Sequence, residues 1–260
     1  MPIIVIGHAD IERVLTPKIA LQLVSDAMRA VSRGDTIHLL RKILHLPGSR
    51  GIVGDMPGSL GEQAAFGLKC ISIFPPSPDG RAPHLGFLVL CEPNNGVPVA
   101  VLEAGAVTAI RTAAATALAT RCLARRSARM LSILGAGEQA EHHIPALLDA
   151  CPFDEVRVWA RRPAAAQALV DMFYGRFPVR MRAVASVREV ANADVICTLT
   201  SSDEPILMGE WVSQGAHVNL IGSSSTGLLW SILAFNLGHA ARKTRRAVAA
   251  QWPSTRSSST

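Results

Sequence analysis

The hydrophobic and polar positions of the chain follow two patterns that change near residue 115. After a short apolar run over residues 2–7, apolar residues recur at helical spacing up to Met28, and Asp10 stands where it can cap a helix. From residue 37 to 103 the pattern becomes short β-like runs separated by turn signals such as PGSRG and PNNG. This first part is predicted to be an antiparallel sheet with one helix against it.

The second part alternates strand and helix signals. An alanine- and leucine-rich helix over residues 107–124 leads into it. From residue 130 to 222 apolar runs alternate with amphipathic segments, which is typical of a parallel sheet with helices on both faces. We therefore predict an α/β fold with a Rossmann-type nucleotide domain and an α+β antiparallel-sheet domain. The predicted divisions are 1–115, 116–222 and a divergent tail, 223–260.

A glycine-rich turn connects the first strand of the second part to its helix. In the sequence LSILGAGEQA, Gly135 allows a tight turn, Gly137 lets the backbone approach a pyrophosphate, and Ala140 permits close packing of helix and strand. Tight turns without any nucleotide use the same glycines, but the following strand, EVRVWARR, lies at the distance that a βαβ unit needs. The predicted cofactor residues of this turn are Gly135, Ala136, Gly137, Glu138 and Gln139.

Most of the net positive charge of the chain lies in its last 38 residues. The net charge is +6, but residues 223–260 carry five Lys and Arg and no acid, so the other residues sum to +1. Specific nucleic-acid binding is therefore not expected of the whole fold, although a basic tail can bind polyanions weakly or simply be solvated. The strand-helix alternation also stops at Gly222, where a doubly wound domain needs at least one further strand.

Composition narrows the class of protein further. No run of eighteen apolar residues appears, and the N-terminus has neither the basic region nor the cleavage site of a secretory signal. We expect a cytoplasmic protein without a membrane segment. The five cysteines are widely spaced and odd in number, which favours neither a disulfide framework nor a zinc site. We expect them to be reduced and mostly buried, and we predict no metal site.

Several motifs together resemble the ornithine cyclodeaminase and μ-crystallin family. They are GLKCISIFP, PNNGVPVAVLE, RTAAATALAT, LGAGEQA and GEWVSQGAHVNLIG, in the order of the family and over about residues 1–222. The resemblance implies a homodimer of two-domain subunits, in which the antiparallel sheet forms the dimer interface and the Rossmann domain binds NAD(H) or NADP(H). Family members continue for many tens of residues beyond this point, so we expect a truncated or altered C-terminus.

The resemblance also implies the substrate and the residues that bind it. Family members include cyclodeaminases, reductases of cyclic imino acids and alanine dehydrogenases, which all move a hydride to or from an amino-acid α-carbon. Arg111 matches the arginine that holds the substrate carboxylate, and its planar guanidinium suits that group. Lys69, in an otherwise apolar run, matches a lysine that contacts substrate, while Arg41 and His84 match an arginine and a histidine near it. We predict Lys69 and Arg111 to be catalytic.

Cofactor preference is predicted from the end of the second strand. An NAD site usually has an acid there for the ribose hydroxyls, whereas an arginine suits a 2′-phosphate. This chain has Arg161 and Arg162 and no acid, so NADP(H) is favoured and NAD(H) is possible, unless the arginines only solvate a loop. We also count Thr112, Thr198 and Thr200 among the cofactor residues, although threonines at strand ends are common.

One missing residue separates the activities of the family. The cyclodeaminases have an aspartate after the strand HVNLIG, whereas this chain has Gly222 followed by three serines. Serine is a poor general base, and a cyclic iminium already carries the charge that lets it accept hydride. We therefore predict an NAD(P)H-dependent reductase of pyrroline-2-carboxylate or piperideine-2-carboxylate. An ornithine cyclodeaminase and a non-catalytic or inactive NADP-binding member of the family remain the alternatives.

Overall fold

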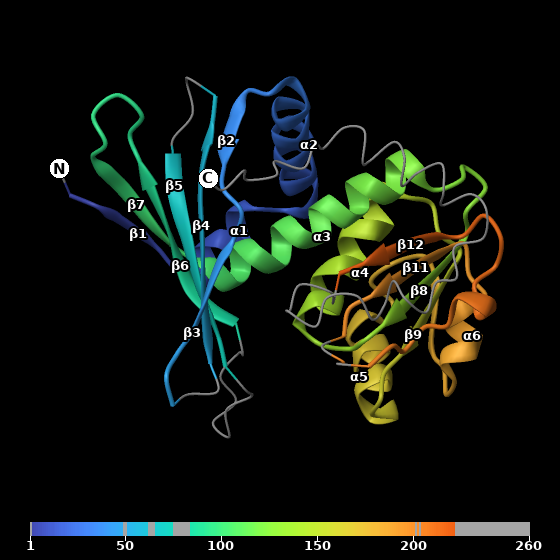
Figure 1. Cartoon of the computed structure of the whole chain (residues 1–260). Coiled ribbons are helices and arrows are strands. Elements are labelled where there is room, and N and C mark those ends of the chain that lie inside the picture. Colours follow the sequence, from blue (N-terminus) through green and yellow to red (C-terminus); the bar gives the residue numbers. More distant parts are fainter. Residues whose placement is uncertain are drawn as a thin grey trace, which may run out of the picture.

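The computed structural model describes residues 2–48, 51–61, 66–74, 84–200, 202 and 204–221. This part of the chain forms two sheets joined by one long helix, α3 (Ala104–Leu123) (Figure 1). The predicted α/β class, with one parallel sheet and one largely antiparallel sheet, is confirmed.

The first sheet has seven strands. Its order is β1-β7-β6-β5-β4-β2, and β3 also pairs with β4. The pairs from β2 to β7 are antiparallel as predicted, whereas β1 runs parallel to β7 and makes the sheet mixed. The strands are β1 (Ile4–Ile6), β2 (Thr36–His38), β3 (Lys42–His45), β4 (Ile52–Leu60), β5 (Phe66–Ile73), β6 (His84–Cys91) and β7 (Pro98–Glu103).

The N-terminal region contains two helices where the sequence analysis expects one, α1 (His8–Val14) and α2 (Pro17–Arg33). Pro17 lacks a backbone N–H and has a fixed φ, which suits the first position of a helix. Thr16 caps α2 by accepting a hydrogen bond from the Ile19 amide at 3.4 Å. Asp10 lies in the first turn of α1 and pairs with Arg13. The prediction that Asp10 caps a single helix is therefore wrong, because Thr16 and Pro17 start a second one.

The second sheet agrees closely with the predicted alternation. Its five parallel strands have the order β10-β9-β8-β11-β12. Helices α4 (Glu138–Ala150) and α5 (Pro163–Phe173) contribute to the core on one face, and α6 (Val187–Ala191) contributes to the core on the other. A short 3₁₀ helix, η1 (Gly209–Trp211), precedes the last strand. The strands are β8 (Met130–Leu134), β9 (Glu155–Trp159), β10 (Arg180–Ala183), β11 (Val195–Thr198) and β12 (His217–Leu220).

Helix α3 packs against elements of both sheets. It begins directly after β7, and the Glu103 carboxylate caps it by accepting from the Gly105 and Ala106 amides. Six of its alanines are buried, and their small side chains let neighbouring elements approach from several sides: Ala104, Ala106, Ala109, Ala113, Ala114 and Ala117. The domain boundary predicted between residues 115 and 116 falls inside this continuous helix, and the division stays a prediction.

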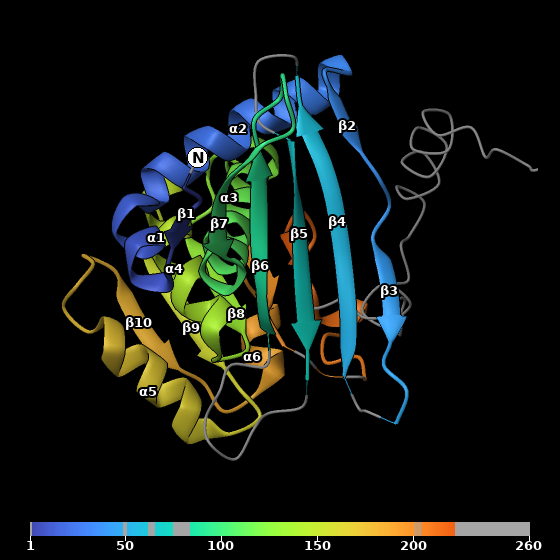
Figure 2. The ribbon, with the colours of Figure 1, turned by 90° about the vertical axis from the view of Figure 1, so that its left-hand side faces the viewer.

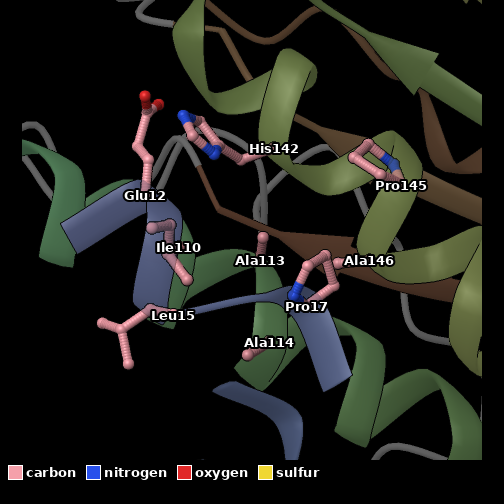
Figure 3. Close-up of a pocket in the computed structure, with 9 residues that line it drawn as sticks. All are labelled: Glu12, Leu15, Pro17, Ile110, Ala113, Ala114, His142, Pro145 and Ala146. Carbon is pink, nitrogen blue, oxygen red and sulfur yellow. The ribbon is translucent and has the colours of Figure 1, made fainter. Parts of the chain in front are cut away.

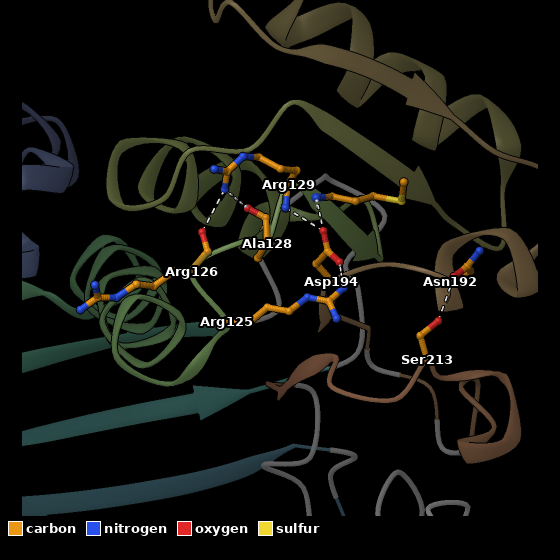
Figure 4. Close-up of polar contacts among 8 residues, drawn as sticks. Arg125, Arg126, Ala128, Arg129, Asn192, Asp194 and Ser213 are labelled. Atoms are coloured by element: carbon orange, nitrogen blue, oxygen red, sulfur yellow. Dashed lines mark hydrogen bonds and ion pairs between the residues drawn. The ribbon is translucent and has the colours of Figure 1, made fainter.

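Asp194 joins the start of β11 to the start of β8 (Figure 4). Its carboxylate accepts hydrogen bonds from the Arg129 and Met130 amides, at 2.7 and 2.9 Å, and pairs with the Arg125 guanidinium. Burial alone raises the pKa of Asp194, but the hydrogen bonds from Arg129, Arg125 and Met130 outweigh it and lower that pKa. The ionised carboxylate therefore stabilises the pairing of β8 and β11 where these two strands begin.

Replacing Asp194 with Asn should lower the free energy of unfolding at neutral pH by about 1–3 kcal/mol, because the amide group cannot accept all three bonds. Since folding lowers the pKa of Asp194, its contribution is present at neutral pH and lost as the pH falls through that pKa. When the free energy of unfolding is measured in urea and plotted against pH, the curves of the wild type and of Asp194→Asn should converge in acid. Asp154→Asn is the control, because its exposed carboxylate lies 3.9 Å from Arg129. An equal loss of stability in both variants would contradict this account.

Candidate functional site

Three parallel strands end together at the glycine-rich turn. The Gly135 amide donates to the Trp159 carbonyl at 2.8 Å, and the Leu199 amide donates to the Leu134 carbonyl at 2.7 Å. The carboxyl ends of β8, β9 and β11 therefore meet at residues 135–137. In open parallel sheets this edge is where ligands bind.

The two glycines of the turn are required for different reasons. Gly135 has a φ of 122°, and a Cβ there would lie 2.5 Å from the Leu199 carbonyl oxygen, so the fold itself excludes a side chain. Gly137 has a φ of −111°, which any residue adopts, and a Cβ there would meet no protein atom within 4 Å. Nothing in the described residues requires glycine at position 137. A ligand that lies against the backbone would require it.

Helix α4 begins at this turn without a side-chain cap. The Ala140 and Glu141 amides donate to the Gly137 carbonyl. The amides ahead of them belong to the first turn, where a helix offers no acceptor, and the helix dipole favours an anion in front of them. Ala140 is completely buried in the core, which allows the helix to lie close to the sheet. Gln139 has a buried side-chain oxygen without a hydrogen-bond donor among the described residues.

Three cationic side chains gather on the face of the first sheet that α3 covers. Lys69 lies on β5, and its Nζ donates to Thr108 Oγ1 on α3 at 3.2 Å. Arg111 lies on the same helix, less than one turn further along. Arg41 precedes β3, and its Cδ lies 3.7 Å from the position of a Cβ at Gly54, over the same face. The structure thus brings together three of the predicted substrate residues from three separate elements.

The pKa of Lys69 shows how these charges act on one another. Burial and then the positive charges of Arg111 and Arg41 lower the pKa of Lys69 to about 8. Loss of water around part of its guanidinium, and then repulsion from Arg41, also lower the pKa of Arg111. Both arginines keep solvent-exposed surface, so water moderates their repulsion. None of the described groups that act on Lys69 is an acid. A cluster of mutually repelling cations is unfavourable for folding and suits an anionic ligand.

Thr108 is a residue of this cluster that sequence reasoning missed. It is part-buried and touches Lys69, yet no motif of the chain singles it out. Its position three and four residues before Arg111 and Thr112 places all three on one side of α3. That spacing is the signal that would have identified it.

The predicted cofactor threonines do not all present a free hydroxyl. Thr198 is 4% exposed and donates to the Asn219 carbonyl at 3.5 Å, so it joins β11 to β12. Thr112 donates to the carbonyl four residues earlier at 2.6 Å. Thr200 lies just beyond β11 and accepts from the Ser202 amide at 3.2 Å. Each of these side chains therefore has an intramolecular partner, Thr198 and Thr200 at the carboxyl ends of the strands and Thr112 within α3.

Other predicted residues lie further along the same edge or outside the description. Arg161 and Arg162 directly follow β9 and are exposed, with Arg162 in the N-cap position of α5. His84 is the first residue of β6, opposite Ile73, but its side chain lies outside the described part. Residues 222–225, where the sequence lacks the aspartate of the cyclodeaminases, also lie outside it.

A cavity of about 150 Å³ lies beside α3 (Figure 3). Ile110, Ala113 and Ala114 face it from α3, and the rest of its wall comes from α1, the start of α2, the link between these two helices, and α4. At 100° per residue these positions point away from Thr108 and Arg111. The cavity is therefore separate from the cluster and takes no part in the site proposed below.

The described residues contain no helix with the length and apolar character of a membrane span, and no group of His, Cys, Asp or Glu arranged to hold a metal. All five cysteines are free, but Cys197 alone is buried. The expectation that most are buried is wrong. Cys70 and Cys91 illustrate the reason, because they lie on the face of the first sheet that α3 does not cover.

Comparison with known proteins identifies relatives for most of the chain. The model of the "Ornithine cyclodeaminase/mu-crystallin family" matches residues 4–234. Ketimine reductase mu-crystallin of Rattus norvegicus is 36% identical over 193 residues, which cover 74% of this chain and 60% of the relative. The chain thus matches less than two thirds of the length of that relative.

Two solved structures have a similar fold. Delta(1)-pyrroline-2-carboxylate reductase of Thermococcus litoralis, in complex with NADH and L-proline, has a TM-score of 0.81 and 27% identity, covering 84% of this chain and 68% of its own. An archaeal alanine dehydrogenase dimer with bound NAD has a TM-score of 0.82 and 28% identity, covering 88% and 70%.

Alanine substitutions at the two glycines of the turn should separate their roles. Gly135→Ala should lower the free energy of unfolding by about 1–3 kcal/mol or more, because it forces a side chain into a positive φ and against the Leu199 carbonyl. Gly137→Ala should change it by less than about 0.5 kcal/mol. Urea unfolding without ligands measures both. A loss at Gly137 as large as that at Gly135 would show that the fold, not a ligand, requires this glycine.

Proposed function

Because the chain belongs to the ornithine cyclodeaminase/mu-crystallin family, we propose that it is an NAD(P)H-dependent reductase of cyclic imino acids. The substrates proposed are pyrroline-2-carboxylate and piperideine-2-carboxylate. The observation that carries the proposal is the cluster of Arg41, Lys69 and Arg111, whose charges suit a carboxylate. Similar proteins are named a ketimine reductase and a pyrroline-2-carboxylate reductase, which supports this choice.

In this proposal the chain's own side chains hold and orient the imino acid. Arg111 provides a planar pair of N–H donors for the carboxylate, and Lys69 and Arg41 add positive charge beside it. Fixing the carboxylate fixes the ring, so that one face of the C=N bond is presented to the cofactor. A protonated cyclic imine already carries the charge that makes its carbon accept hydride. This step therefore needs no general base from residues 222–225.

The glycine-rich turn fits the pyrophosphate of a dinucleotide. Gly137 leaves open space beside the backbone, and the uncapped start of α4 offers N–H groups to an anion. When bound, NAD(P)H supplies the hydride that reduces the C=N bond at the α-carbon. Arg161 and Arg162 follow the strand whose end contacts the adenosine ribose in Rossmann domains, which favours NADP(H) in this chain. NADH and NAD are the cofactors in the two similar structures.

We also propose that the chain forms a homodimer through its first sheet. The face opposite α3 carries several exposed apolar side chains, and Figure 2 looks onto this side of the sheet with α1, α2 and α3 behind it. The similar alanine dehydrogenase is described as a dimer. Exposed apolar residues on this face suit contact with a second copy, and they are Val5, Leu44, Phe66, Leu68, Leu85 and Phe87.

The full chain should oxidise NADPH or NADH when pyrroline-2-carboxylate or piperideine-2-carboxylate is added, as followed by the loss of absorbance of the reduced cofactor. Arg111→Ala should raise KM by about tenfold or more and lower kcat, because a charge-assisted pair with the carboxylate is lost. Arg29→Ala is the control, since Arg29 lies exposed on α2 and pairs with Asp26.

Two further measurements would each overturn the reductase proposal. Ammonia release from ornithine without added reductant, and no imine reduction, would identify a cyclodeaminase. Folded protein that binds NADPH in a thermal-shift assay but turns over neither class of substrate would identify a binding protein.

The double variant Arg161→Ala, Arg162→Ala should lower the ratio of kcat/KM for NADPH over NADH by about tenfold, because a 2′-phosphate loses its cationic partners. Activity with NADH should change little. Gly137→Ala is the matched comparison, since it should weaken the binding of NADPH and of NADH equally, through the pyrophosphate that both cofactors contain. An unchanged ratio in the double variant would show that these arginines only solvate the loop.

A further inference from the structure

Thr108 differs from the other threonines of its helix. Four threonines follow one another at intervals of four residues on α3, from Thr108 to Thr120. The hydroxyls of Thr112, Thr116 and Thr120 each donate to the carbonyl four residues earlier, at 2.6, 3.0 and 2.9 Å. Thr108 makes no such bond within the described residues. Its hydroxyl oxygen accepts from Lys69 Nζ at 3.2 Å instead.

Lys69 needs such a partner more than an ordinary lysine does. Its ammonium lies part-buried beside two guanidinium groups that repel it, and its long stem can turn the charge towards solvent. We propose that Thr108 is a positioning residue, whose hydroxyl holds the Lys69 ammonium within the cationic cluster so that it faces the substrate carboxylate. The inference rests on the proposed function for the identity of that carboxylate.

A hydroxyl suits this role better than a charged acceptor. An aspartate at position 108 would hold Lys69 but cancel one of the positive charges that attract the substrate. The threonine oxygen accepts from the ammonium without adding negative charge. Because Thr108 donates to no acceptor among the described residues, its own proton also stays available to an anion in the site.

Titration of Lys69 in the ligand-free protein tests the contact without any turnover. The chain has four lysines, Lys18, Lys42, Lys69 and Lys243, so ¹³C-methylated lysines give few NMR signals, and Lys69→Arg assigns the one in question. Lys69 should titrate near pH 8. Thr108→Val should lower that midpoint by about half a pH unit or more, because the charged form loses its acceptor, and Thr108→Ser should restore it. Signals of the other lysines should not move.

The kinetic consequence is a higher KM with little change in kcat. For pyrroline-2-carboxylate, Thr108→Val should raise KM about three- to tenfold at neutral pH, and Thr108→Ser should return it to that of the wild type. As the pH rises through the Lys69 midpoint, KM should rise, and it should do so at lower pH in Thr108→Val. Thr108→Ala, which favours the helix, provides a second hydroxyl-free variant if the valine disturbs folding.

The outcomes separate the two proposals. An unchanged Lys69 midpoint in folded Thr108→Val and Thr108→Ala overturns the positioning role, whatever the activity. A lowered midpoint that serine restores supports that role even if the wild type reduces no imino acid, in which case the proposed function alone fails. A lowered midpoint with an unchanged KM in an active enzyme would show that Thr108 holds Lys69 but that this contact does not serve the substrate.

Discussion

The packing of one helix against both sheets is the constraint on which the rest of the structure depends. The first half of α3 places Thr108 and Arg111 beside β5, and its second half places Thr116 and Thr120 against α4 and β12. Such contacts on several sides leave room only for small side chains, which is why its buried positions are alanine and threonine. The same helix therefore sets the separation between the cationic cluster and the glycine-rich turn.

A buried histidine, His143, joins α3 and α4, and its contacts require the neutral form of the ring. His143 is fully buried, with Nδ1 2.6 Å from the Gln139 carbonyl and Nε2 3.1 Å from Thr116 Oγ1. Burial lowers the pKa of His143 to about 4, so the ring is neutral and Nδ1 must carry its proton. Nε2 then accepts from Thr116, whose single proton also faces the Thr112 carbonyl. The free energy of unfolding therefore falls as the pH drops from 6.5 towards 4, because the histidine takes up a proton in the unfolded chain before the buried ring does.

Local patterns predicted the second sheet well and the site only in part. Strands such as β8 and helices such as α4 follow from alternation, because a buried parallel strand and an amphipathic helix have different periods. The parallel pairing of β1 was not predictable from a three-residue run. Lys69 and Arg111 meet through pairing and packing across the fold, so only the family resemblance singled them out. The place of Thr198 at a strand end predicts a cofactor residue, but its hydroxyl donates to the Asn219 carbonyl of the neighbouring strand.

Two features of the molecule have no explanation in folding alone. The cations at Lys69, Arg111 and Arg41 repel one another, and Gly137 is glycine although a side chain would meet no protein atom. Both features suit anions, one a carboxylate and the other a pyrophosphate. Under the proposed function, the cations hold the substrate carboxylate and the glycine-rich turn holds the pyrophosphate of the cofactor. In that proposal, the repulsion that the cluster introduces into the fold is the cost of binding the carboxylate.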